Sequence, residues 1–191
     1  MKQIVLASNN KGKLAELQAM FAPLGLQLIA QAELNIPEAE EPFHTFVENA
    51  LAKARHASRI SGLPALADDA GLCVDAFNGL PGVQTAFYCT QFGYEKSDDN
   101  NRRALLEQMQ NTINRRAALV STLVALRHAD DPEPLIASGR AVGEITRELR
   151  GDKGFGFDPV MFIPEMNMTF AEMSEADKNA RSHRGQAARL M

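Results

Sequence analysis

Pro64-Ala65-Leu66-Ala67-Asp68-Asp69-Ala70-Gly71-Leu72-Cys73-Val74 is the stretch that decides how this chain folds, because it sets two adjacent carboxylates directly after an apolar segment. Short apolar runs bounded by turn residues are typical of buried strands. The stretch therefore predicts two strands that meet at a turn carrying Asp68 and Asp69.

The paired aspartates are the sharpest chemical signal in the sequence. Adjacent carboxylates repel each other unless a cation or hydrogen bonds compensate them. Magnesium would do so, since it favours one or two carboxylates together with water and substrate phosphates, and the acidic run Glu38, Glu40 and Glu41 could supply a further ligand. The alternative is a structural turn, in which one aspartate caps backbone amides and the other is solvated.

Outward from this stretch, the apolar spacing alternates between strand and helix patterns. It predicts strands at residues 3–7, 26–30, 117–126, 135–146 and 160–163, the fourth of them bent at Gly139 and Gly143. It predicts helices after the loop at residues 8–13, at 43–60, at 98–109 with Asp98 or Asp99 as the cap, and from Ser174 or Glu175 through Leu190. Strands that alternate with helices early and cluster later indicate an α/β fold with a mixed sheet.

Length and composition narrow the class of protein. A chain of 191 residues is long enough for one substantial domain, and a net charge of −4 disfavours a broad grip on nucleic acid. The N-terminal apolar run is too short for a signal peptide or a membrane span, and Cys73 and Cys89 lack the spacing of a zinc site or a disulfide scaffold. We expect a cytoplasmic protein with reduced thiols and no membrane or nucleic-acid partner.

The loop Ser8-Asn9-Asn10-Lys11-Gly12-Lys13 joins a predicted strand to a predicted helix. Free amides and the positive end of the helix dipole make such a place an anion site, and Lys11 and Lys13 add charge. The spaced glycines of a P-loop are absent. Two interpretations remain at this point, a phosphate site or a capped helix with solvated lysines.

Two later segments also carry groups suited to a ligand. Gly154-Phe155-Gly156-Phe157-Asp158 sets aromatic rings among glycines, so it could admit a flat ligand such as a purine, or be an ordinary glycine-rich turn anchored by core rings. Ser182-His183-Arg184-Gly185 offers hydrogen-bond donors, or forms a solvated helix face. Since no Ser-His-Asp or Cys-His arrangement stands out, covalent catalysis is not expected.

Together these segments resemble the Ham1-like inosine triphosphate pyrophosphatase family, whose members act on non-canonical purine nucleotides, and especially its bacterial branch. The resemblance spans nearly the whole chain. The segments that carry it are Leu6–Lys13, Thr45–Ala50, Ala67–Leu72, Gly154–Pro159 and Ser182–Ala187.

The resemblance implies one catalytic domain over residues 1–191, with an elongated mixed sheet flanked by helices, two lobes and a central cleft, and it implies a homodimer. It implies that Glu41 and Asp69 bind Mg²⁺, with Asp68 in support. The substrate-binding residues that it implies are Ser8, Asn9, Asn10, Lys11, Gly12, Lys13 and Lys53 for the phosphates, and Ala70, Phe155, Gly156, Phe157, Asp158, Lys178, His183 and Arg184 for the rest of the nucleotide.

The reaction expected from this resemblance is hydrolysis of ITP, dITP or XTP to the monophosphate and pyrophosphate. Water would attack the α-phosphorus, with Asp69 accepting its proton or positioning it. Donors aimed at the 6-oxo group would accept hypoxanthine and xanthine, whereas adenine carries an amino group there.

Two positions depart from the family pattern. Ala70 stands where the family usually has Ser, and Phe87 stands where it usually has Arg. A non-enzymatic nucleotide sensor would not need the paired aspartates, and the Maf-like pyrophosphatases usually open with a Ser-Pro-Arg-Arg type of loop that this chain lacks. Both rival interpretations are therefore weaker than the pyrophosphatase.

Overall fold

The computed structural model describes residues 2–191, which form helices and a seven-stranded mixed sheet in the order β2-β1-β3-β4-β5-β6-β7. The strands are β1 (Lys2–Leu6), β2 (Leu26–Ala30), β3 (Ala65–Val74), β4 (Arg116–Leu126), β5 (Leu135–Ile145), β6 (Met161–Ile163) and β7 (Met168–Thr169). Strand β1 pairs in parallel with β2 and β3, whereas β5, β6 and β7 pair antiparallel in succession. The α/β class with a mixed sheet is confirmed.

The chain divides into two compact units. The first comprises the segment up to Asp69, Ser121–Gly139 and His183–Met191, and the second comprises Ala70–Val120 and Arg140–Ser182. Because the boundaries fall inside β3, β4 and β5, each of these strands contributes residues to both units.

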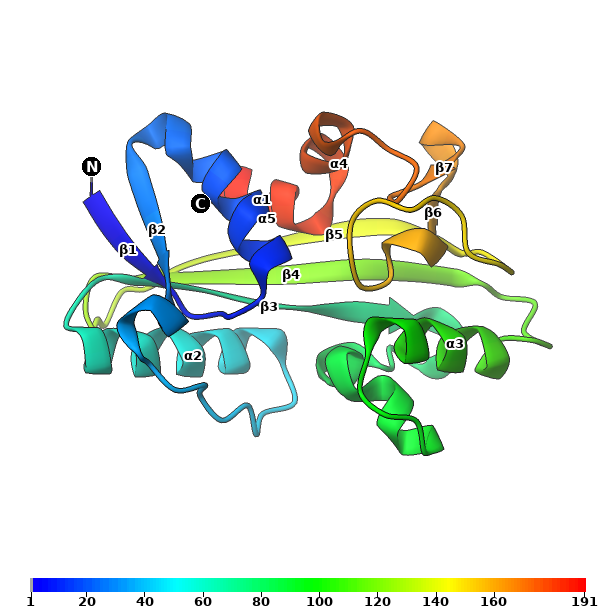
Figure 1. Cartoon of the computed structure of the whole chain (residues 1–191), viewed down its shortest axis with the longest axis horizontal. Coiled ribbons are helices and arrows are strands. Elements are labelled where there is room, and N and C mark those ends of the chain that lie inside the picture. Colours follow the sequence, from blue (N-terminus) through cyan, green and yellow to red (C-terminus); the bar gives the residue numbers. More distant parts are fainter. Residues whose placement is uncertain (1) are drawn as a thin grey trace. The chain divides into compact units, whose positions relative to one another are not determined.

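In the first unit, helix α2 (Phe46–Ser61) covers one face of the strands (Figure 1). Its buried alanines, Ala50, Ala54 and Ala57, pack in one apolar cluster with Val5, Ala7, Ala65, Ala67, Val124 and Leu126 of the strands. These strand residues alternate along the chain, as a pleated strand requires for side chains on the same face. Small side chains on both surfaces let the helix backbone approach the sheet closely.

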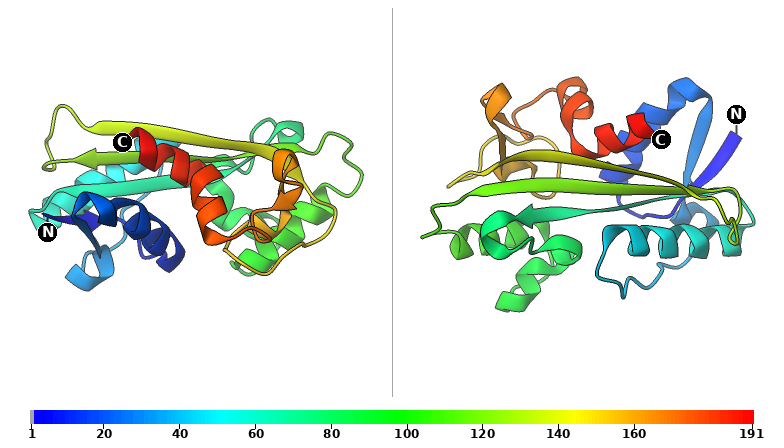
Figure 2. Two further views of the ribbon diagram at one scale, coloured as in Figure 1. Left: turned by 90° about the horizontal axis from the view of Figure 1, so that it is seen from above. Right: turned by 180° about the vertical axis from the view of Figure 1, so that it is seen from behind.

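Helices α1 (Lys11–Phe21) and α5 (His183–Leu190) cover the opposite face of the first unit and contact each other (Figures 1 and 2). The other set of alternating strand residues packs against them, and this cluster consists of Leu6, Leu28, Leu66 and Leu123 with Leu17, Phe21 and Ala187. The first unit is therefore a helix–sheet–helix sandwich with two separate apolar layers.

The second unit has its own apolar core. Helix α3 (Asp98–Gln108) packs against the 3-10 segment η4 (Gly82–Phe92), which the sequence pattern did not predict (Figure 2). Buried residues of α3 and η4 join one cluster with those of β3 to β6, including Leu72, Leu105 and Met161.

Two expectations about strands need correction. Residues 65–74 form one continuous strand, so Asp68 and Asp69 do not lie on a turn. Strand β5 continues without a break through Gly139 and Gly143, where close neighbours occupy the space that a Cβ atom would need. A Cβ atom at Gly143 would lie 2.1 Å from the carbonyl oxygen of Phe162.

Two expectations about helices also need correction. The C-terminal helix is two helices, α4 (Glu175–Arg181) and α5, separated by Ser182 in an extended conformation. The cap of α3 is Ser97, whose hydroxyl accepts a hydrogen bond from the amide of Asn100. Asp98 and Asp99 instead occupy the first helical turn, where their charge is favourable to the helix dipole.

Gly139 of β5 lies against the first turn of α5, and we expect Gly139→Ala to destabilise the protein. A Cβ atom there would lie 2.0 Å from the carbonyl oxygen of His183 and 2.6 Å from the amide nitrogen of Ala187. Forced overpacking of this kind costs roughly 1–3 kcal/mol. Urea unfolding measures the loss, and Ile136→Ala at an exposed position of β5 is the control. Equal stability of the two variants would contradict the prediction.

Candidate active site

Strand β3 carries the candidate catalytic carboxylates. Successive side chains of a strand point to opposite faces, so Asp68 continues the face of Leu66 and Asp69 continues the face of Ala67. Asp68 accordingly contacts α1 and α5, while Asp69 contacts α2. The cations and hydrogen bonds expected to compensate the pair are therefore divided between the two faces. Each has its own partners.

Asp68 lies at the centre of a buried ion network. Its Oδ2 accepts from Arg184 Nε at 2.9 Å and lies 3.2 Å from Lys13 Nζ, and its Oδ1 accepts from the Ser121 hydroxyl at 2.6 Å. Arg184 also donates from Nη1 to Glu16 on α1 at 2.5 Å. Burial alone would raise the pKa of Asp68, but Arg184, Lys13 and the Ser121 hydrogen bond together hold it well below its usual range. Asp68 is thus an anion that joins β3 to α1 and α5.

Asp69 has a different environment. Its Oδ1 accepts from Lys53 Nζ at 2.7 Å, and the same ammonium group lies 3.0 Å from Glu41 Oε2. Its Oδ2 is buried and has no hydrogen-bond partner among residues 2–191. Burial raises the pKa of Asp69 and the Glu41 carboxylate adds to this, although Lys53 opposes it. Asp69 therefore has an oxygen atom available to a ligand or a reacting water.

The loop before α1 is built as an N-cap. The Asn10 side chain accepts from the amide of Lys13 at 3.0 Å, and Ser8 Oγ accepts from the amide of Asn10 at 3.1 Å. Asn9 donates to Glu38 at 3.1 Å, and Lys11 is exposed. Gly12 follows in the first turn of α1. The structure thus brings the start of α1, Lys13 and Asp68 together within the first unit.

Lys13 links this loop to β3. Its ammonium group donates to the carbonyl oxygen of Asp68 at 3.2 Å. Burial lowers its pKa, Asp68 opposes this shift, and Arg184 and Lys53 add to it. Lys13 is therefore tied to Asp68 by both its ion pair and its hydrogen bond.

The glycine-rich segment and Lys178 form a second cluster, within the second unit. Asp158 Oδ2 accepts from the amide of Phe155 at 2.8 Å and from Lys178 Nζ at 2.6 Å. The Lys178 ammonium also lies 4.7 Å from the centre of the Phe155 ring. Phe157 is buried in the core of this unit. One ring is thus a core anchor, and the other packs against a cation.

The remaining predicted residues lie as follows. His183 and Arg184 are buried in the first turn of α5, so they are not on a solvated helix face. Ala70 is partly buried on β3 in the second unit. Phe87 is half exposed on η4, and the Lys96 ammonium lies 3.9 Å from its ring centre.

Four residues in these networks escaped the sequence analysis. Ser121 lies in an apolar run, where no local signal distinguishes its hydroxyl. Glu16 follows Lys13 by three positions, a spacing that puts both side chains on one helix face. Asp98 and Arg102 have the corresponding spacing of four on α3, and both bond to Gly156. Helical spacing was therefore the one signal in the sequence that could have identified Glu16, Asp98 and Arg102.

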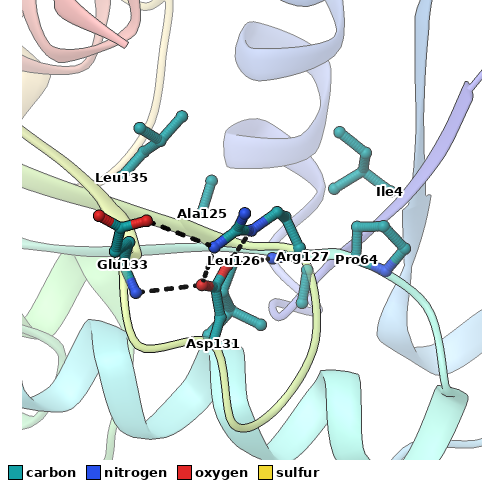
Figure 3. Close-up of a pocket in the computed structure, with 9 residues that line it drawn as sticks. Ile4, Pro64, Ala125, Leu126, Arg127, Asp131, Glu133 and Leu135 are labelled. Carbon is teal, nitrogen blue, oxygen red and sulfur yellow. Dashed lines mark hydrogen bonds and ion pairs between the residues drawn. The ribbon is translucent and has the colours of Figure 1, made fainter.

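A separate hollow of about 520 Å³ lies in the first unit and is shown in Figure 3. Its lining residues are Ile4, Pro64, Ala65, Ala125, Leu126, Arg127, Asp131, Glu133 and Leu135. The Arg127 side chain donates from Nε to Asp131 at 2.8 Å and also lies 3.9 Å from Glu133, so the one cation of this lining is paired with both of its carboxylates. None of the predicted site residues lines this hollow, whose lining is mostly apolar. The candidate chemistry belongs instead to the charged clusters.

Both cysteines, Cys73 and Cys89, are free, as predicted. Across the part of the chain that the structure describes, no group of three or more His, Cys, Asp or Glu side chains is arranged to hold a metal ion. Likewise, no described helix has the length and apolar character needed to cross a bilayer.

Comparison with known proteins gives consistent matches over the whole chain. The Ham1 family model matches residues 4–191. The dITP/XTP pyrophosphatase of Albidiferax ferrireducens is 75% identical over 99% of this chain and 95% of its own length, and that of Ralstonia nicotianae is 57% identical over 98% and 93%. The structure of a HAM1 protein from Coxiella burnetii superposes with a TM-score of 0.89 at 43% identity and covers 99% of this chain and 95% of that one.

The neighbouring aspartates should respond differently to the same substitution. Asp68→Asn leaves the cations of Arg184 and Lys13 without their buried partner, and breaking such pairs costs roughly 3–5 kcal/mol. Asp69→Asn leaves Lys53 paired with Glu41, and the Asp69 carboxylate already has a raised pKa, so we expect a smaller loss than for Asp68→Asn. Urea unfolding of both variants measures the difference. Similar losses in the two would contradict the opposite-face arrangement.

Proposed function

The chain belongs to the Ham1 family, and from this premise we propose that it hydrolyses non-canonical purine nucleoside triphosphates such as dITP, ITP and XTP to the monophosphate and pyrophosphate. The observation that carries the proposal is the Asp69 carboxylate, which has one oxygen on Lys53 and the other buried without a partner. Such an enzyme removes these nucleotides from the pool before they enter nucleic acid.

The residues around Asp69 fit a magnesium ion. Glu41 and Asp69 offer hard oxygen donors, and magnesium characteristically takes one or two carboxylates and completes its shell with water and substrate phosphates. The unpartnered Asp69 Oδ2 is an atom that such an ion would satisfy. When bound, Mg²⁺ would neutralise charge on the phosphate oxygens. We assign Glu41 and Asp69 as its ligands.

Cations and amides of the first unit are proposed to bind the triphosphate. The start of α1 presents amides and the positive end of its dipole, together with Ser8, Asn9, Asn10, Lys11 and Gly12. Lys13, partly buried, and Lys53, buried, add two ammonium groups next to the aspartates. A polyanion would gain charge-assisted hydrogen bonds from both.

Asp69 is also proposed to act on the attacking water. Besides binding the metal ion, its carboxylate would orient the water that attacks the α-phosphorus or accept its proton. Asp68 holds Lys13 and Arg184 in place and remains ionised. Its proposed part in catalysis is to fix this arrangement.

Recognition of the base and sugar is proposed for Ala70, Phe155, Gly156, Phe157 and Asp158. Lys178 is proposed as a donor to the 6-oxo oxygen, and His183 and Arg184 are proposed as further substrate-binding residues. A site that hydrogen-bonds this oxygen rejects adenine, which would leave the donors unpaired.

We also propose that the protein is a homodimer in the cytoplasm. Free cysteines are typical of a reducing compartment. Sedimentation of the purified protein tests the dimer directly.

The decisive assay is pyrophosphate release from ITP, dITP, XTP, GTP and ATP with magnesium. We expect rapid release from the first three, and a loss of about 10²- to 10⁴-fold in kcat for Asp69→Asn, the range that general-base catalysis supplies. Asp130→Asn is the matched control, because Asp130 is exposed and pairs with Arg59 alone among the described contacts. Binding of ITP without pyrophosphate release by the folded wild-type protein would favour a nucleotide sensor.

A further inference from the structure

The Phe155–Asp158 turn is held from outside by helix α3. Gly156 adopts a left-handed conformation with φ of 59°, and Gly154 adopts one with φ of 74°. Nothing lies within 4 Å of a Cβ atom built on Gly156, so its conformation, and not crowding, calls for glycine. A glycine in this region retains more conformational freedom than other residues, and an external constraint can reduce it.

Both polar groups of the Gly156 residue are bonded to α3. Its amide donates to Asp98 Oδ2 at 2.9 Å, and its carbonyl oxygen accepts from Arg102 Nη1 at 2.6 Å. Positions four apart on a helix lie on one face, so Asp98 and Arg102 reach the same residue from neighbouring turns. Arg102 also pairs with Asp99. We call Asp98 and Arg102 the Gly156 clamp.

The clamp rests on a rigid support. Ala104 and Leu105 of α3 are fully buried in the core of the second unit. Asn101 accepts from the amide of Cys89 at 2.9 Å and donates to the carbonyl oxygen of Ala86 at 3.2 Å, which ties α3 to η4. A side chain that projects from such a helix can hold a loop at a defined position.

We propose that Asp98 and Arg102 are positioning residues that hold the Phe155–Asp158 turn in the conformation that receives the purine base. This inference rests on the proposed function. The turn is constrained at Gly156 by the clamp and at Asp158 by Lys178. Phe155 directly precedes Gly156, and its amide donates to Asp158 Oδ2 at 2.8 Å, so both constraints act on the backbone that carries its ring.

Loss of the clamp should weaken nucleotide binding and leave the chemical step intact. When a loop is already ordered, ligand binding does not have to offset the entropy cost of ordering that loop. A hydrogen bond to a charged group contributes enough that its loss corresponds to a change on the order of tenfold in affinity. We therefore expect Arg102→Ala to raise the KM for ITP about tenfold while kcat stays within about twofold of wild type.

The experiment compares Arg102→Ala and Asp98→Ala with Arg103→Ala. Arg103 is the neighbouring arginine of α3, exposed and paired with Glu107, so its variant reports the effect of an arginine loss on the helix alone. Steady-state kinetics with ITP give KM and kcat. Calorimetric titration with inosine monophosphate, in the absence of metal, measures binding without the reaction. We expect both clamp variants to raise the KM for ITP and to weaken the binding of inosine monophosphate, and we expect Arg103→Ala to match wild type in both measurements.

Two further variants separate positioning from stability. Arg102→Lys keeps one donor and should recover part of the affinity, and the double variant should lose less than the sum of the single losses, because both side chains act on one residue. Asp98 is exposed, so Asp98→Ala provides the test if Arg102→Ala does not fold.

The outcomes distinguish this inference from the function on which it rests. A wild-type protein that hydrolyses ITP, with clamp variants whose KM and inosine monophosphate affinity equal those of Arg103→Ala, would overturn the clamp and leave the proposed function intact. A wild-type protein that hydrolyses none of the nucleotides would instead overturn the proposed function.

Discussion

The alternation of side chains along β3 is the constraint on which the rest of the site depends. Because of this alternation, Asp68 contacts α1 and α5 on one face of the first unit, and Asp69 contacts α2 on the other face. Two carboxylates that are adjacent in sequence thereby acquire separate counter-ions and opposite pKa shifts. The same alternation separates the two apolar clusters of the unit, so packing and electrostatics follow one geometric rule.

Folding and function are joined most closely at Asp68. Burying its charge costs several kcal/mol unless ion pairs and hydrogen bonds compensate. The compensation comes from α1, β4 and α5, whose residues Lys13, Ser121 and Arg184 are far apart in the chain. The site is therefore complete only after these elements have packed, and Lys13 owes its orientation to the same carboxylate. Asp69, with its unpartnered oxygen, is the member of the pair left available for chemistry.

The second unit uses a different device to order its candidate binding residues. Glycines in the left-handed region let the backbone turn sharply, and side-chain bonds from α3 and from Lys178 remove the freedom that those glycines bring. Position 154 requires glycine for a steric reason as well, since a Cβ atom there would lie 2.1 Å from Asp158 Oδ2. The turn is thus held by α3 at the backbone of Gly156 and by Lys178 at the side chain of Asp158.

Local pattern was sufficient for the α/β class, for most strands and helices, for the capped start of α1 and for the family resemblance, because each depends on residues close together in the chain. It was insufficient where neighbours in space decide. The sequence suggested a turn at Asp68-Asp69, since it does not reveal the cations that allow carboxylates inside a strand. The tertiary structure alone revealed three further contacts. These are the burial of Arg184, the hydrogen bond from the Ser121 hydroxyl and the hydrogen bonds between α3 and Gly156. Each is a contact between distant segments, and its energy exists only when those segments are packed together.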